Sequence, residues 1–228
     1  MRLSILGRTM FANAPAKDQN RHWDEVYGRN REFFGQAESG FARKALAVFQ
    51  EGQAKALLEL GPGQGRDTLF FARNGFAVVA LDYSGQAMAE LSAAAQAQGL
   101  ASRVTAQAHD IRLPLPCPDE SFDLCYSHML LCMHLTRQEV ASAIQEMRRV
   151  LRPGGIVAYS VRSVFDKHHG AGQHLGEAIY AVEGFVVHFF SEAMIRDLAQ
   201  GFAITEISRM EEGSLPRDLL AVFMKKLG

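Results

Sequence analysis

Short runs rich in apolar residues recur along this chain, and glycine, proline or polar residues follow each of them. Such runs are typical of strands that are buried on both faces of a parallel sheet. They predict strands over 55–60, 76–81, 103–108, 122–126 and 156–161, and two more strand-like runs cover 202–208 and 219–225.

Between these runs, apolar residues recur every three or four positions, which predicts amphipathic helices. The helices are expected over 21–34, 37–50, 67–73, 136–151 and 191–200, with another beginning after Ser84. Ser84 is a suitable N-cap, and Thr136 with Glu139 has the T-x-x-E spacing of a capping box.

Strands and helices alternate along most of the chain, which predicts an α/β fold with a doubly wound, mostly parallel sheet. We expect a single domain over residues 1–228, with a helical cap at about 20–36. The alternation stops at about 162–188, where four glycines and four histidines occur without clear periodicity. An irregular segment of this length inside a domain is usually a functional lid or a disordered loop.

Composition narrows the possible functions. The chain has 228 residues, of which 48% are hydrophobic and 21% charged, and these values exclude a disordered protein. The net charge of −1 gives no broad positive field, so we expect no nucleic-acid partner. Three cysteines and the lack of an 18-residue apolar run predict a cytoplasmic protein that does not cross a membrane.

The first predicted strand ends in Glu59-Leu60-Gly61-Pro62-Gly63-Gln64-Gly65, a glycine turn before a helix. A P-loop is excluded because Arg66-Asp67 stands where Lys-Ser/Thr is needed, and Arg66 also breaks the dinucleotide fingerprint G-x-G-x-x-G. A carboxylate at Glu59 would repel a pyrophosphate, whereas it would attract a ligand with an amino group or a sulfonium.

Two further acids, Asp82 and Asp110, follow the second and third strands. Asp82 is placed to accept both hydroxyl groups of a ribose, and Asp110 can accept from an exocyclic amine. Tyr83 and Ile111 offer apolar faces to a purine. The alternatives are that Asp82 only caps the following helix and that Asp110 only starts a turn. The set favours an uncharged ribose, an adenine and a cationic amino-acid tail.

Five motifs in this order resemble the class I S-adenosylmethionine-dependent methyltransferases. They are the E-x-G-x-G-x-G loop, the acid at Asp82, D-I after the third strand, F-D-L-C-Y-S-H on the fourth strand and R-R-V-L-R-P-G-G-I-V before the fifth. The resemblance covers about residues 37–160. It implies a Rossmann-like sheet of seven strands whose last strand is antiparallel, and S-adenosylmethionine as the cofactor. The residues it assigns to the cofactor are Glu59, Gly61, Pro62, Gly63, Gly65, Asp82, Tyr83, Ser84, His109, Asp110, Ile111, Ser127 and His128.

At the N-terminus, Trp23, Asp24 and Tyr27 resemble the start of small-molecule methyltransferases of the tellurite-resistance and thiopurine type. This resemblance implies that Trp23 and Tyr27 lie on a helix that covers the cofactor, although packing in the core is the alternative for both residues.

The expected activity is in-line transfer of a methyl group to a small-molecule nucleophile. The alternatives are a non-catalytic module that binds S-adenosylmethionine and, less favoured, a methyltransferase acting on protein or nucleic acid. His128 and His188 are candidate general bases, or else residues of the pocket wall. We expect no metal, because no acid or cysteine accompanies His168, His169 and His174 at a ligand spacing.

Overall fold

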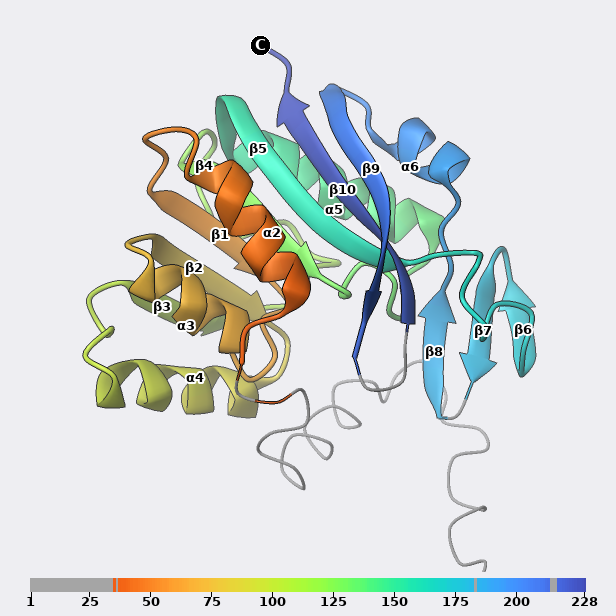
Figure 1. The fold of residues 1–228 in the computed structure, drawn as a ribbon, viewed down its shortest axis with the longest axis horizontal. Helices are drawn as coiled ribbons and strands as arrows, with labels where there is room; N and C mark the ends of the chain where they lie inside the picture. The colour runs from red at the N-terminus through yellow and green to blue at the C-terminus, as the bar shows by residue number, and fades with distance from the viewer. Residues whose placement is uncertain (1–34, 36, 183, 214–216) are drawn as a thin grey trace, which may run out of the picture.

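The protein is described from a computed structural model that covers residues 35, 37–182, 184–213 and 217–228. Its centre is a seven-stranded sheet with the order β3-β2-β1-β4-β5-β10-β9 (Figure 1). All neighbouring strands are parallel from β3 to β5, whereas β10 is antiparallel to both β5 and β9. The predicted α/β sheet with an antiparallel last strand is therefore confirmed. The strands are β1 (Ala56–Leu60), β2 (Ala77–Asp82), β3 (Val104–Ala108), β4 (Phe122–His128), β5 (Leu151–Arg162), β9 (Phe202–Glu212) and β10 (Arg217–Lys226).

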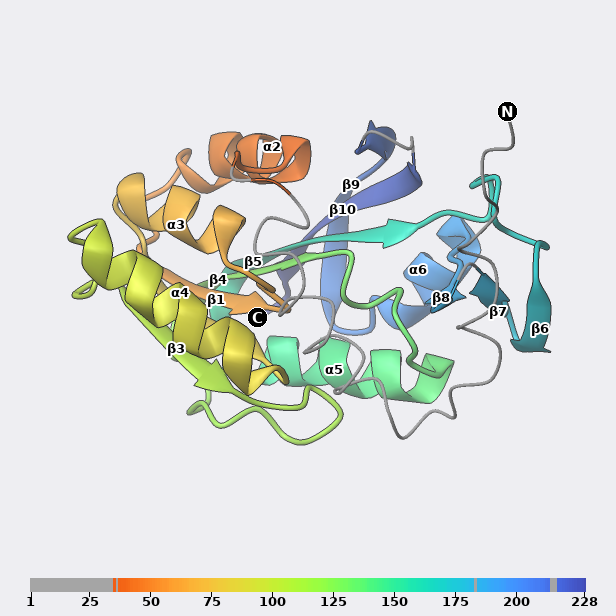
Figure 2. The ribbon, with the colours of Figure 1, turned by 90° about the horizontal axis from the view of Figure 1, so that it is seen from below.

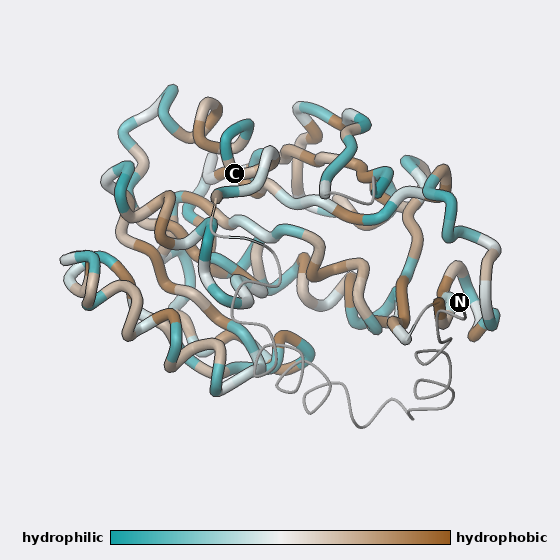
Figure 3. Tube along the Cα trace, turned by 60° about the horizontal axis from the view of Figure 1, so that its bottom comes forward, coloured by the Kyte–Doolittle hydropathy of each residue, from teal (hydrophilic) through white to brown (hydrophobic). Residues whose placement is uncertain are grey.

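Helices cover both faces of this sheet, with α2 and α3 on one side and α5 on the other (Figure 2). One face packs α2 and α3 around Tyr126 and Phe223, while the opposite face packs α5 and α6 around Cys125 and Tyr159. Hydrophobic residues are concentrated along the inner strands (Figure 3). The helices are α2 (Gly40–Phe49), α3 (Arg66–Arg73), α4 (Gly85–Ala97), α5 (Arg137–Val150) and α6 (Glu192–Leu198).

Side-chain caps fix where several helices begin. The Ser84 hydroxyl accepts from the N–H of Ala87, and Thr136 and Glu139 form the expected capping box. Each cap satisfies an amide that has no partner inside its helix. Among the described helices, none is both long and apolar enough to cross a membrane.

Two segments differ from the sequence-based expectation. Strand β4 continues to His128, so Ser127 and His128 are its last two residues rather than part of a following loop. The segment expected to be irregular forms a second sheet of three short antiparallel strands, β6 (Gln173–Gly176), β7 (Ile179–Val182) and β8 (Phe185–His188). It lies outside the main sheet, beyond β5 (Figure 1). The predicted cap at 20–36, with Trp23 and Tyr27, lies outside the described residues, apart from residue 35.

Candidate active site at the carboxyl edge of the sheet

The glycine loop follows β1, at the point where the strand order reverses between β1 and β4. Ligands of open α/β sheets bind at this position. Gly61 and Gly65 have φ angles of 72° and 83°, in the left-handed region that favours glycine. A Cβ at Gly61 would lie 2.7 Å from Cβ of Leu130, and one at Gly65 would lie 2.3 Å from Cδ1 of Leu91. Glycine is therefore required at both positions, because a Cβ would clash with these leucines and would need a strained backbone.

Asp82 ends β2 beside this loop. Its carboxylate accepts from the N–H of Gly63 at 3.1 Å and from the N–H of Ser84 at 3.0 Å. The side chain therefore joins the glycine loop to the start of α4, which goes beyond the capping role considered as an alternative.

Glu59 is buried beneath the loop, where its side chain accepts a hydrogen bond of 2.6 Å from the Thr68 hydroxyl. Burial, together with the negative charges of Asp67 and Asp82, raises the pKa of Glu59 to about 8. The site is thus rich in carboxyl groups that repel one another. A cationic ligand nearby would relieve this repulsion, and an anionic one would increase it.

Asp110 follows β3 and is only partly available to a ligand. The Arg112 guanidinium donates to Oδ1 of Asp110 at 2.9 Å and to Oδ2 at 2.5 Å. These hydrogen bonds are the main reason why the pKa of Asp110 is lowered. The N–H of Arg112 also bonds to Asp110, so the turn considered as an alternative is present. Ile111 is buried next to it, and the N–H of His109 donates to the carbonyl of Asp82. The adenine-binding role of Asp110 stays a prediction.

Two polar side chains end β4. Ser127 is fully buried and its hydroxyl has no hydrogen-bond partner among the described residues. The Nδ1 atom of His128 lies 2.6 Å from the Ser160 hydroxyl, while its Nε2 is buried and unpartnered within the same part of the chain. Burial lowers the pKa of His128, which favours the neutral imidazole. A neutral ring held at Nδ1 can accept a proton at Nε2.

His188, the other candidate base, joins the small sheet to the segment after β4. Its N–H donates to the carbonyl of Cys132 at 2.9 Å, and its Nδ1 lies 2.9 Å from the carbonyl oxygen of Leu135. Burial lowers its pKa as well. These contacts indicate that His188 holds the insert in place, and a role as a base stays a prediction.

A buried network around Asp67 was not singled out from the sequence. The Asp67 carboxylate accepts from the Tyr126 hydroxyl at 2.8 Å, from the Ser39 hydroxyl at 2.8 Å and from the Ser39 N–H at 2.7 Å. It thereby connects the first turn of α3 to β4 and to the start of α2. In the sequence, Asp67 stands out only as an acid directly after Gly65-Arg66. There it helped to exclude a P-loop and was assigned no other role.

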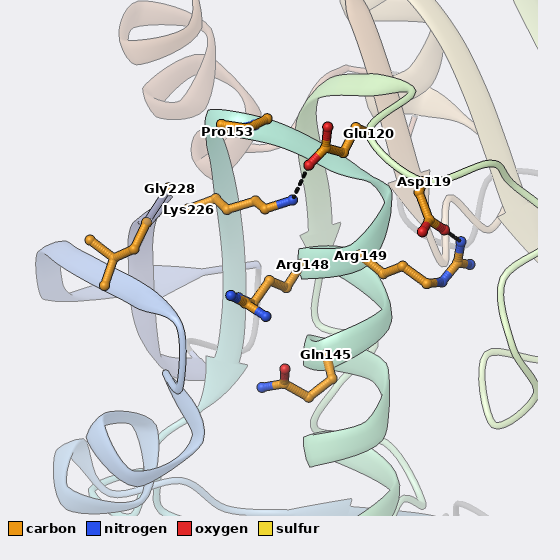
Figure 4. Close-up of a pocket in the computed structure, with 9 residues that line it drawn as sticks. Asp119, Glu120, Gln145, Arg148, Arg149, Pro153, Lys226 and Gly228 are labelled. Atoms are coloured by element: carbon orange, nitrogen blue, oxygen red, sulfur yellow. Dashed lines mark hydrogen bonds and ion pairs between the residues drawn. The ribbon is translucent and has the colours of Figure 1, made fainter.

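A cavity of about 570 Å³ lies at the opposite edge of the sheet, near the end of β10 (Figure 4). Two of its cations are already paired, Arg149 with Asp119 at 2.7 Å and Lys226 with Glu120 at 3.4 Å. This cavity includes none of the predicted cofactor residues. The candidate site is therefore assigned to the glycine-loop edge from the strand topology and the side chains placed there.

The residues at that edge fit S-adenosylmethionine. Gly61 and Gly65 allow the tight turn that brings the loop backbone to the end of β1, and Asp82 offers a carboxylate to a ribose. Glu59 is protonated in the free protein because its pKa is about 8, and a sulfonium or amino group nearby would favour its ionised form. The hydroxyl of Ser127 and Nε2 of His128 are buried polar atoms without described partners at the adjacent strand end.

Comparison with known proteins agrees with this fit. Residues 57–155 match a family model described as a methyltransferase domain. Malonyl-[acyl-carrier protein] O-methyltransferase of Pectobacterium atrosepticum is 31% identical over 129 residues, which are 56% of this chain and 46% of that protein. The chain spans about half the length, or less, of the curated relatives it matches.

Solved structures share the fold over nearly the whole chain. The 1,6-didemethyltoxoflavin-N1-methyltransferase of Burkholderia thailandensis, solved with S-adenosylhomocysteine, has a TM-score of 0.72 at 21% identity, covering 95% of this chain and 92% of that one. The [4+2]-cyclase SpnF has a TM-score of 0.74 at 20% identity, covering 94% and 98%. The domain match identifies residues 57–155 as a methyltransferase domain, and the solved structures show that the chain shares the fold of S-adenosylmethionine-dependent methyltransferases.

Proposed function

We propose that this chain transfers the methyl group of S-adenosylmethionine to a small-molecule nucleophile. The observation that carries the proposal is the glycine loop with the carboxyl groups of Glu59 and Asp82 at the carboxyl edge of the sheet. When bound, the cofactor supplies a methyl carbon that its positive sulfur has already activated.

The chain's own residues have to hold the two reactants in line and exclude water. Asp82 is proposed to bind the ribose, because it ends β2 beside the loop that it also holds in shape. The apolar side chains of Leu130 and Met129 follow β4 directly and pack against the core. They border the same edge and favour a dry site.

Where the acceptor atom carries a proton, His128 is the proposed group that takes it. The Ser160 hydroxyl orients the ring through Nδ1, and the lowered pKa keeps the ring neutral at pH 7. Phe185 of β8 and Tyr83 pack against the same hydrophobic cluster, so the small sheet lies beside the candidate site. The substrate is therefore proposed to enter from the side of the small sheet.

A small acceptor is favoured over nucleic acid by the net charge of −1. The printed names of the relatives include a malonyl-[acyl-carrier protein] O-methyltransferase and a phosphoethanolamine N-methyltransferase. A protein-tethered acceptor is thus the second possibility, although its reactive end would still be a small group.

The test is formation of S-adenosylhomocysteine by the purified protein with a panel of small thiols, amines, phenols and carboxylic acids. Turnover with at least one of them supports the proposal, and His128→Gln should then slow turnover of protonated acceptors more than that of ionised ones. Tight cofactor binding without turnover on any acceptor would instead indicate a binding module.

A further inference from the structure

Arg217 is a partly buried cation that has no hydrogen bond or ion pair to the described residues. It is the first residue of β10, and its cross-strand partner on β9 is Glu212. An acid directly opposite would normally neutralise it. Here, however, Glu212 accepts from the N–H of Gly40 at 3.2 Å and lies 3.7 Å from Arg66. The acid that could pair with Arg217 is therefore committed elsewhere.

The strand register places Arg217 at the candidate active site. Leu219 of β10 pairs with Arg162, the last residue of β5, so Arg217 lies beyond the carboxyl end of β5. Since side chains alternate along a strand, Arg217 shares a face of the sheet with Ala221, which packs in one cluster with Tyr126 of β4. By the same alternation, Tyr126 shares its face with His128. Arg217 and His128 thus lie on one face at one edge.

The charges around Arg217 agree with this placement. Burial and then the positive charge of Arg162 lower the pKa of Arg217, electrostatic interactions with Cys132 and Asp166 oppose this, and Arg66 adds a smaller lowering. The charge of Arg217 in turn acts on His128 and Cys132. Arg162 itself is neutralised by Asp166 at 2.6 Å. A guanidinium without a partner, close to two other cations and partly out of water, is costly unless an anion binds there.

We propose, on the basis of the proposed function, that the methyl acceptor carries a carboxylate group and that Arg217 binds it. A planar guanidinium matches a carboxylate through two parallel hydrogen bonds. The negative charges of Glu212 and Asp67 act on the same His128. They would repel a phosphate dianion more strongly than a carboxylate monoanion, so the monoanion is favoured. Arg217 is thus a specificity-determining residue that holds the acceptor beside the imidazole.

Binding assays on the protein loaded with S-adenosylhomocysteine test this directly. The probes are benzoate and acetate, each paired with its neutral amide, benzamide and acetamide, with inorganic phosphate as a further arm. The wild type should bind the carboxylates at least about tenfold more tightly than the amides, and Arg217→Gln should lose about 10- to 100-fold of that affinity.

Arg209→Gln is the matched control, because Arg209 is an exposed arginine on the same hairpin whose charge is paired with Asp218. It should leave carboxylate binding unchanged. Equal binding of acids and amides, no carboxylate binding at all, or full binding by Arg217→Gln would each overturn the inference. Stronger, Arg217-dependent binding of phosphate would overturn the assignment to carboxylates.

Failure of the proposed function looks different in the same experiment. It would appear as no binding of S-adenosylhomocysteine by the wild type in calorimetry, before any acceptor is added. Arg217→Gln should keep the affinity for S-adenosylhomocysteine within about twofold and should not lower the urea midpoint, because the side chain has no polar partner among the described residues to lose and its burial is costly.

Discussion

Replacing Gly61 by alanine tests whether the glycine loop has to be built as described. The φ angle of 72° places the residue in the left-handed region, which costs an alanine about 1–2 kcal/mol. The added Cβ would also lie 2.7–2.9 Å from three side-chain atoms of Leu130, and such overpacking costs about 1–3 kcal/mol. The sum predicts that Gly61→Ala lowers the free energy of unfolding by about 2–5 kcal/mol.

Gly99→Ala is a matched control for the backbone contribution. Gly99 has a φ angle of 70°, and a Cβ there would meet nothing within 4 Å, so only the loss of about 1–2 kcal/mol is expected. Urea unfolding of both variants measures the difference. Calorimetry with S-adenosylhomocysteine should show weaker binding for Gly61→Ala and unchanged binding for Gly99→Ala. Equal destabilisation by the two substitutions would refute the packing argument.

Three other substitutions test the side chains around the loop. Asp82→Asn should weaken cofactor binding by about 1–3 kcal/mol, because the amide nitrogen cannot accept and the charge is lost; an unchanged dissociation constant in calorimetry would contradict the ribose assignment. The Glu59 carboxyl, whose pKa rises from 4.5 to about 8 on folding, takes up a proton when the chain folds. Stability of the free protein should therefore fall as pH rises from about 5 to about 8, and Glu59→Gln should flatten this slope in urea midpoints; an equally steep slope in the variant would assign it to other groups. Tyr126→Phe removes the hydroxyl that donates to Asp67 and should cost about 1–3 kcal/mol in urea unfolding, whereas a neutral effect would mean that the network is not stabilising.

The order of strands and helices could be predicted from the sequence because it follows from local periodicity. The same holds for the capping box of Thr136 and Glu139, whose partners are three residues apart. The common edge for Glu59 and Asp82 also followed, since parallel strands end at one edge of a sheet. These features need only short-range signals and a topological rule.

Contacts between distant segments could not be predicted in this way. The hydroxyl of Tyr126 reaches Asp67 across 59 positions of the chain, and the N–H of Ser39 reaches the same carboxylate across 28. The guanidinium of Arg217 has no polar partner among the described residues because the carboxylate of Glu212 is held by Gly40 and Arg66 instead. The pattern of hydrophobic and polar residues does not indicate which partner the Glu212 side chain contacts.

The small sheet of β6, β7 and β8 was missed for a different reason. Its strands have four residues each, and the pairing of β6 with β7 is irregular between His174 and Gly176. Strands this short give almost no alternation to detect, and the glycines resemble those of a loop. Nε2 of His174, for example, donates to the carbonyl oxygen of Glu177, and its ring lies beside the ring of Tyr180.

The central claim is that carboxyl groups at the ends of neighbouring strands select a positively charged nucleoside over a phosphorylated one. Calorimetry of the wild-type protein with S-adenosylmethionine, NAD and ATP, each repeated with Asp82→Asn, tests it most directly. We expect saturable binding of S-adenosylmethionine that Asp82→Asn weakens, and no binding of NAD or ATP. Binding of NAD or ATP that depends on Asp82, without binding of S-adenosylmethionine, would contradict it.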